Sequence, residues 1–176
     1  MIYPVLETER LLLRQLAPDD AKDLFEYFSL DEVMEYYDLE TFKTPEDARN
    51  IIQHFNSEFE KGKGYRWALE LKSEQKVIGT CGYHNWHREH FRAEIGYELN
   101  PKFWRNSYMK EAILSILTFG FESMRLHRVD AFIDPSNIAS EKLLQSLNFK
   151  DEGTLRDYFF EKGKFVDAKI FGLINE

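Results

Sequence analysis

Apolar residues recur at every third or fourth position through the middle of the chain, and this spacing predicts a helix of about four turns. A strand precedes the helix over Ala93–Leu99 and ends at Asn100-Pro101, because proline cannot continue a sheet ladder. A short apolar run over Val129–Ile133 follows the helix and reads as a buried strand. The helical positions are Met109, Ala112, Ile113, Ile116, Leu117, Gly120 and Met124.

Polar residues mark the ends of this helix and of a shorter helix that follows it. Asn106 or Ser107 is suited to cap the long helix, because either side chain can accept a hydrogen bond from a free amide of the first turn. Ser136 or Asn137 begins the second helix. Asn148 is expected to end that helix, since asparagine tolerates the left-handed conformation found there. Its predicted inner face consists of Leu143, Leu144 and Leu147.

The rest of the chain adds two helices and several strands. Helices are predicted to begin at Pro18 and at Thr44, while Asp31–Phe42 lacks a clean period and is predicted as loop or irregular helix. The order strand, two helices, three strands, helix, strand, helix, two strands indicates an α+β domain with a mixed, mostly antiparallel sheet and helices on both faces. We expect one domain over residues 7–175. The other predicted strands are residues 10–16, 65–71, 77–83, 153–160 and 165–173.

Composition narrows the range of functions. The 176 residues carry a net charge of −8, which argues against nonspecific nucleic-acid binding and suits a basic or amine substrate. A single cysteine, Cys81, excludes an internal disulfide and suits a reducing cytosol. The N-terminal residues lack the basic flank and apolar run of a signal peptide, and no apolar stretch reaches membrane-spanning length. We therefore expect a cytoplasmic protein that binds neither membrane nor nucleic acid.

The segment Trp104–Met109 places a helix N-terminus directly after the end of a strand. Unpaired backbone amides and the positive end of the helix dipole make such a position attractive to anions. Three basic residues surround it, namely Lys102, Arg105 and Lys110. The segment is a candidate phosphate-binding turn, although most helix N-termini bind only water.

Two motifs in this region carry a resemblance to a known family. The sequence EIGYELNPKFW, continued by SYM and EA in the helix, is followed by LHRVDAFIDPSNIAS and LNF. Together they resemble the GNAT superfamily of acetyl-CoA-dependent N-acetyltransferases, and most closely the branch that acetylates the N-terminal alanine or serine of ribosomal proteins. The likeness extends over nearly the whole chain from Glu7, so it implies the GNAT fold.

The resemblance implies a binding site for coenzyme A. The turn before the long helix would wrap the pyrophosphate with backbone amides, and the pantetheine arm would lie beside Leu99, paired with strand backbone. Arg105 and Ser107 stand where the family usually has glycine, which lets a backbone approach a phosphate closely. Whether Arg105 helps or obstructs binding stays open. The implied cofactor residues are Leu99, Trp104, Arg105, Asn106, Ser107, Tyr108 and Met109, with Asn137 for the pantetheine amide and Lys142 for the terminal phosphate.

A GNAT reaction needs a base to deprotonate the acceptor ammonium. The strand Ala93–Leu99 places Glu94, Gly96 and Glu98 on one face. Several branches of the family use a glutamate in this context, so Glu94 is the candidate base. A carboxylate that faces a pocket tends to have a raised pKa, which suits that role. The alternative is that Glu94 only pairs with Arg92 or Arg66.

The leaving thiolate needs a proton or a hydrogen bond. Many family members use a tyrosine where this chain has Leu144, and the ribosomal branch is described with a carboxylate where this chain has Phe159, so neither role is transferred. Ser140 occupies the position that the ribosomal branch places near the thiolate. The alternative is that its hydroxyl only caps the second helix.

Other candidate sites compete less well. His84, His87 and His90 follow at three-residue spacing and could bind zinc on a helix, but they lie between two strands in a predicted solvated loop, so no metal site is assigned. Cys81 reads as a buried hydrophobe rather than a nucleophile. The aromatic run Tyr158–Phe160 is predicted to pack in the core and hairpin, and the resemblance places it beside the acceptor site.

The sequence therefore predicts an acetyltransferase that uses acetyl-CoA as co-substrate, contains no metal and acts as a monomer or homodimer. A protein or peptide N-terminal α-amine is the expected acceptor. Small amines such as polyamines or aminoglycosides are the alternative acceptors. Two other classes stay open. One is a non-catalytic acyl-CoA-binding protein, favoured by Arg105, Ser107 and the missing tyrosine and carboxylate; the other is a metal-dependent enzyme that uses the histidines.

Overall fold

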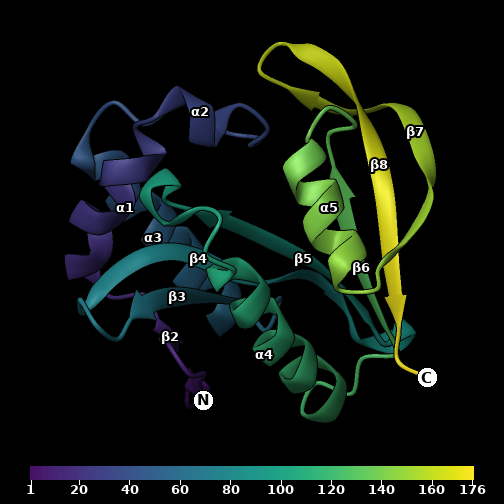
Figure 1. Cartoon of the computed structure of the whole chain (residues 1–176), viewed down its shortest axis with the longest axis horizontal. Coiled ribbons are helices and arrows are strands. Elements are labelled where there is room, and N and C mark those ends of the chain that lie inside the picture. The colour runs from purple at the N-terminus through teal and green to yellow at the C-terminus, as the bar shows by residue number, and fades with distance from the viewer.

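One eight-stranded sheet forms the centre of the computed structural model, which describes all 176 residues (Figure 1). Its strand order is β1-β2-β3-β4-β5-β6-β8-β7, and every neighbouring pair is antiparallel except β5 with β6. The predicted mixed, mostly antiparallel sheet is thus confirmed. The strands are β1 (Leu6–Glu7), β2 (Leu11–Gln15), β3 (Tyr65–Leu71), β4 (Lys76–His87), β5 (Arg92–Leu99), β6 (Arg128–Ile133), β7 (Lys150–Glu161) and β8 (Lys164–Ile174).

Helices cover both faces of the sheet, as the sequence predicts. Trp67 and Ala68, adjacent in β3, point to opposite faces because strand side chains alternate. Trp67 enters the larger apolar cluster with α4 and α5, whereas Ala68 enters a smaller cluster with α1 and α3. No helix is both long and apolar enough to cross a membrane. The helices are α1 (Ala21–Phe28), α2 (Asp31–Met34), α3 (Pro45–Glu60), α4 (Tyr108–Glu122) and α5 (Ile138–Ser146).

The parallel pair at the centre of the sheet diverges soon after it begins. β5 and β6 pair only over Arg92–Glu94 and Arg128–Asp130. Beyond this point β6 keeps its pairing with β8 up to Ile133, while residues 95–99 of β5 have no strand on that side. The sheet therefore opens into a gap, and the end of β5 presents an unpaired edge near the first turn of α4 and the first turn of α5 (Figure 1).

The loop predicted over His84–His90 is wrong in its first half. β4 continues to His87, and a register shift interrupts its pairing with β5 between His84 and His87. A short 3-10 turn over Arg88–His90 then leads to Phe91, which takes a left-handed conformation with φ of 49°. The strand is longer than predicted because β5 supplies partners, His84 opposite Glu94 and His87 opposite Arg92.

The aromatic run on β7 is not core, contrary to expectation. Tyr158, Phe159 and Phe160 are 50%, 36% and 65% exposed. Their strand is irregular, with a register shift between Leu155 and Phe159, and the hairpin projects past the other strands beside α5 (Figure 1). The rings of Tyr158 and Phe159 contact Phe132 and each other. Phe160 packs on Phe165 across the hairpin, as predicted.

Candidate active site

The N-terminus of α4 presents a run of free backbone amides. The first helical hydrogen bond runs from the Glu111 amide to the Ser107 carbonyl, at 3.0 Å. The amides of residues 105–110 donate no hydrogen bond within the protein. Unpaired amides at the positive end of a helix dipole bind phosphate oxygens well. The geometry therefore fits a polyphosphate at the predicted turn.

Two residues of this turn have a backbone conformation that glycine adopts most easily. Arg105 has φ of 62° and Ser107 has φ of 61°, both in the left-handed region. A side chain there costs about 1–2 kcal/mol, which explains why glycine suits these positions. Ser107 is the N-cap residue, but its side chain makes no capping hydrogen bond, so the predicted side-chain cap is wrong.

Two side chains hold the turn against the end of β5. The indole of Trp104 donates a hydrogen bond to the carbonyl of Leu99 at 2.9 Å. The amide side chain of Asn106 donates to the carbonyl of Trp104, also at 2.9 Å. These bonds tie the loop to the strand end and to its own backbone, and they account for Trp104 and Asn106 as supports of the turn.

A cavity of about 880 Å³ lies at the gap between β5 and β6. It contains both candidate catalytic residues, Glu94 and Ser140, together with Asn137. Leu99, Lys142 and the turn over residues 104–109 do not line it. The cavity is bounded by β3, β4, β5 and β6, by α3 with residues 36–39, and by Phe159 and Glu161 of β7.

Glu94 is anchored by hydrogen bonds rather than by arginine. His84 and Asn85 each contact its carboxylate at 3.1 Å, through Nε2 and Nδ2. Burial raises the pKa of Glu94, but the contacts with His84 and Asn85 and the charge of Arg92 outweigh it, so the pKa lies below the ordinary value. The expected raised pKa is therefore wrong. So is the pairing with Arg66, which binds Glu98 instead.

Ser140 contacts a residue that sequence reasoning did not include. Its hydroxyl hydrogen-bonds the hydroxyl of Tyr97, across the gap from β5 to α5. The capping interpretation of this hydroxyl is wrong, because the Ser140 backbone amide, not the hydroxyl, bonds to the cap residue Asn137, at 3.2 Å. Burial raises the pKa of Tyr97. No local signal in the sequence could reveal Tyr97, since it lies 43 residues from Ser140.

Asn137 begins α5 as predicted and has one group left for a ligand. Its side-chain oxygen accepts the bond from the Ser140 amide. A hydrogen bond from Asn137 to a pantetheine carbonyl would therefore come from Nδ2. Lys142 is exposed on the same helix and makes no hydrogen bond or ion pair.

The alternative sites are not assembled by the fold. No three histidine, cysteine, aspartate or glutamate side chains converge as metal ligands. His84 contacts Glu94, whereas His87 and His90 lie 3.7 Å and 3.9 Å from Glu89. Cys81 is fully buried, and burial raises the pKa of its thiol to about 12, which makes it a poor nucleophile.

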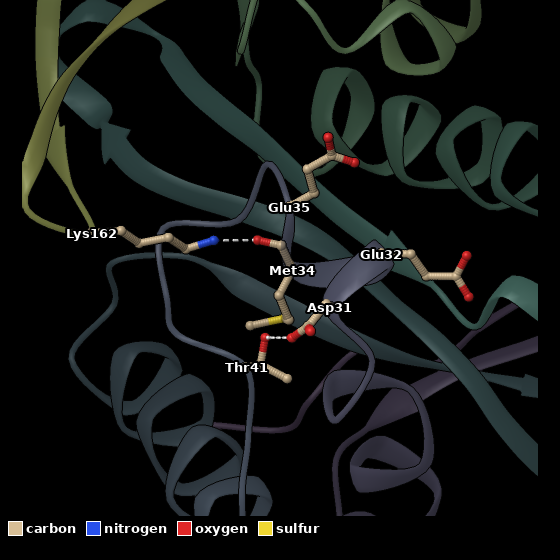
Figure 2. A pocket seen from close by; sticks show the side chains of 6 residues that line it. All are labelled: Asp31, Glu32, Met34, Glu35, Thr41 and Lys162. Carbon is tan, nitrogen blue, oxygen red and sulfur yellow. Dashed lines mark hydrogen bonds between the residues drawn. The ribbon is translucent and has the colours of Figure 1, made fainter.

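The segment over residues 31–42 reaches the β7–β8 hairpin. Lys162 donates a hydrogen bond to the carbonyl of Met34, and Thr41 donates to Asp31 at 2.6 Å (Figure 2). The hydroxyl of Tyr36 contacts the carbonyl of Ser136 at 3.2 Å. The bonds made by Lys162 and Tyr36 join this segment to the β7–β8 hairpin and to the residues before α5, and Tyr36 itself lines the large cavity.

Comparison with known proteins places the chain in a family. A model of the GNAT acetyltransferase domain matches residues 10–150. The chain is 39% identical to the uncharacterized N-acetyltransferase YoaA of Bacillus subtilis, over 98% of both chains. It is 26% identical to the [ribosomal protein uS5]-alanine N-acetyltransferase of Escherichia coli, over 96% of this chain and 89% of that protein.

Solved structures share the fold. A GNAT-family acetyltransferase from Bacillus anthracis superposes with a TM-score of 0.85 at 27% identity, covering 97% of this chain and 98% of that one. RimL, a ribosomal L7/L12 α-N-protein acetyltransferase solved with coenzyme A, gives a TM-score of 0.87 at 16% identity with the same coverage. The chain therefore belongs to the GNAT family of acetyl-CoA-dependent N-acetyltransferases.

Proposed function

We propose that this enzyme acetylates the N-terminal α-amine of a protein or peptide, in the cytoplasm, through one domain over residues 7–175. The observation that carries the proposal is the cavity at the gap between β5 and β6, which is lined by Glu94 and by the hydrogen-bonded pair Tyr97 and Ser140. Relatives named for acetylation of ribosomal proteins support the choice of acceptor.

Coenzyme A is proposed to enter between the N-termini of α4 and α5. The free amides of residues 105–109 would bind the pyrophosphate, and the unpaired edge of β5 up to Leu99 would pair with the pantetheine arm as a strand does. Asn137 would donate to the pantetheine through Nδ2, and Lys142 would reach the terminal phosphate. In this arrangement the thioester lies near the Tyr97–Ser140 pair.

The chemistry assigns one proton transfer to each side of the thioester. Glu94 accepts the proton of the acceptor ammonium directly or through one water; its lowered pKa keeps it ionised but makes it a weaker base than a carboxylate with a raised pKa. The free amine attacks the carbonyl carbon and forms the C–N bond. The nitrogen then gives up its second proton as the C–S bond breaks, and this proton balances the one that the departing sulfur takes up. The Ser140 hydroxyl then supplies a hydrogen bond or proton to the departing sulfur, and the hydroxyl of Tyr97 supports it.

Acidic side chains around the cavity favour a cationic acceptor. Asp38, Asp134 and Glu161 line it together with Glu94. Burial raises the pKa of Glu161, and the charges of Asp38 and Asp134 raise it further, which indicates a locally negative potential. Such a potential attracts an ammonium group to the acceptor end.

The test is consumption of acetyl-CoA with peptides of one sequence, one with a free N-terminus and one with a blocked N-terminus that retains a lysine. We expect only the free peptide to be acetylated, with the acetyl group located on the α-amine by mass spectrometry. Acetylation of polyamines or aminoglycosides alone would overturn the assigned acceptor. Tight binding of acetyl-CoA without turnover of any amine would instead indicate a binding protein.

A further inference from the structure

Arg66 lines the cavity, and contacts with several neighbouring side chains hold its guanidinium group in place. Its Nε donates to the hydroxyl of Thr80 at 2.7 Å, and its Nη2 donates to the Glu98 carboxylate and, at 3.4 Å, to the hydroxyl of Tyr37. The guanidinium carbon also lies 4.9 Å from the centre of the Phe55 ring. Contacts on three sides therefore fix the plane of the guanidinium group.

The remaining nitrogen of Arg66, Nη1, makes no hydrogen bond within the protein. No fully buried side-chain nitrogen or oxygen lacks a partner, so Nη1 must still be accessible, and Arg66 lines the cavity. It lies 2.6 Å from the point where a Cβ on Gly96 would stand. Glycine at this position leaves Nη1 uncovered beside the cavity floor.

The charge of Arg66 is already balanced. Glu98 pairs with it and also accepts hydrogen bonds from Thr80 at 2.5 Å and Tyr27 at 3.0 Å. Because Glu94 and Glu161 line the same cavity, a ligand carboxylate would meet net negative potential there. A neutral carbonyl oxygen can instead accept from Nη1 without that repulsion, so it is the better partner.

The imidazole ring of His84 lies between the candidate base and the Gly96 position beside Nη1. The Cβ point on Gly96 is 3.3 Å from Cε1 of His84, and Nε2 of the same ring is 3.1 Å from Glu94. Glu94 and Gly96 share one face of β5. In an α-aminoacyl group the amine nitrogen and the carbonyl oxygen are about 3 Å apart, by ordinary bond lengths. With a hydrogen bond of about 3 Å at each end, one α-aminoacyl group can therefore span a base and a donor that are up to about 9 Å apart.

We propose that Nη1 of Arg66 donates a hydrogen bond to the carbonyl oxygen of the acceptor's first residue, which makes the enzyme selective for α-aminoacyl groups over amines without a carbonyl. The inference rests on the proposed acetylation of N-terminal α-amines. It identifies the residue that recognises the peptide carbonyl by a hydrogen bond. A buried donor built to hydrogen-bond a ligand group discriminates against analogues that lack the group, because the donor is then left unpaired.

Three bisubstrate analogues test this without turnover. In each, coenzyme A sulfur is joined through a CH2–CO link to an amine: alaninamide, isopropylamine or alanine. By calorimetry, we expect wild type to bind the alaninamide analogue about 10- to 100-fold more tightly than the isopropylamine analogue, the effect of one hydrogen bond from a charged donor. The alanine analogue, which carries a carboxylate, should bind less tightly than the alaninamide analogue.

Two variants assign the effect to Arg66. Arg66→Lys keeps a cation for Glu98 but lacks the second donor nitrogen, and Gly96→Ala places a Cβ against Nη1. In both variants the preference for alaninamide should fall to about onefold to threefold, while plain coenzyme A, which binds at α4, keeps its wild-type affinity. Circular dichroism melting checks that each variant is folded.

The possible results are distinct. The alaninamide and isopropylamine analogues could have equal affinities for wild type, both tighter than that of coenzyme A. In that case Arg66 does not hydrogen-bond the carbonyl, and the inference is overturned. Tightest binding of the alanine analogue would also overturn it, in favour of a carboxylate. If no analogue binds more tightly than coenzyme A and no amine is acetylated, the proposed function itself fails, and the inference with it.

Discussion

The hydroxyl groups of Tyr97 and Ser140 are hydrogen-bonded to each other across the gap in the sheet. Tyr97 belongs to β5, and Ser140 lies in the first turn of α5, so the pair connects the two elements between which the cofactor is proposed to run. Both residues line the cavity. The tyrosine beside Ser140 thus comes from the strand, whereas Leu144, one turn further along α5, is fully buried.

Ser140→Ala should lower kcat by about 10- to 100-fold, because it removes a hydrogen bond or proton from the departing thiolate, with little change in the KM for acetyl-CoA. Tyr97→Phe should show a smaller loss of the same kind. If the two hydroxyls act as a unit, the double variant will lose less than the product of the single losses. Steady-state kinetics of the four proteins measure this, and a wild-type kcat in Ser140→Ala would contradict the assigned role.

Glu94→Gln should lose about 10²–10⁴-fold in rate near neutral pH, because the amide keeps the shape of the side chain but cannot accept the proton. The loss should shrink as pH rises, since the acceptor is then increasingly present as free amine. His84→Gln is a matched control, because it removes a contact of the carboxylate but leaves Glu94 in place. The pH–rate profiles of the three proteins decide, and a loss by the same factor at every pH would mean that Glu94 only positions the substrate.

Ser107→Gly should raise the free energy of unfolding by about 0.5–1 kcal/mol, because glycine relieves the left-handed conformation at φ of 61°. Asn106→Gly, in the same turn but without a positive φ, should lower it instead. Thermal unfolding measures both.

Ser107→Glu tests the phosphate site at the same position. A carboxylate at a helix N-terminus is tolerated by the fold but repels phosphate, so coenzyme A affinity should fall at least about tenfold. Ser107→Gln is the uncharged control and should lose much less. An unchanged Kd for Ser107→Glu, measured by calorimetry, would place the pyrophosphate elsewhere.

Glu26 should make stability sensitive to acid. Contacts with Lys76 and Lys102, at 2.6 Å and 2.9 Å, lower the pKa of its carboxyl from 4.5 to about 2. A lowered pKa in the folded state stabilises the protein above the unfolded pKa, and the contribution disappears as pH falls towards 2. Glu26→Gln should therefore cost about 1 kcal/mol at neutral pH and only a small part of that near pH 2, where the carboxyl of the folded protein begins to be protonated.

Denaturant unfolding between pH 2 and 7 measures this difference. Glu122→Gln is the control, because Glu122 is exposed at the end of α4 and makes no ion pair. A constant difference between Glu26→Gln and wild type across this range would mean that the ion pairs do not set the pH dependence.

Helix positions could be predicted because they depend on local spacing. The apolar positions from Met109 onward, the capping role of Asn137 and the left-handed Asn148 all follow from residues within a few positions of one another. The turn before α4 could also be predicted from local sequence, because Arg105 and Ser107 stand where the resemblance implies glycine. The structure adds the reason, which is the positive φ at both positions.

Contacts between distant segments were decided only by the tertiary structure. The sequence places Glu94 and Ser140 in separate elements, and it correctly predicts the shared face of Glu94, Gly96 and Glu98. It does not predict which arginine pairs with which glutamate, because Arg66 and Glu98 meet through the register of three strands. The low pKa of Glu94 likewise depends on His84, which faces it only because β4 continues past its predicted end.

The sequence by itself thus determined the helices, most strands, the family and the candidate residues, because periodicity, caps and motifs are local. The tertiary structure decided that β6 leaves β5 after Glu94 and stays with β8. That choice opens the gap across which Tyr97 contacts Ser140. The pairing of β3, β4 and β5 brings Nη1 of Arg66 beside Gly96. The point at which β6 leaves β5 depends on how the whole sheet packs both of its faces against the helices. No short stretch of sequence determines this packing.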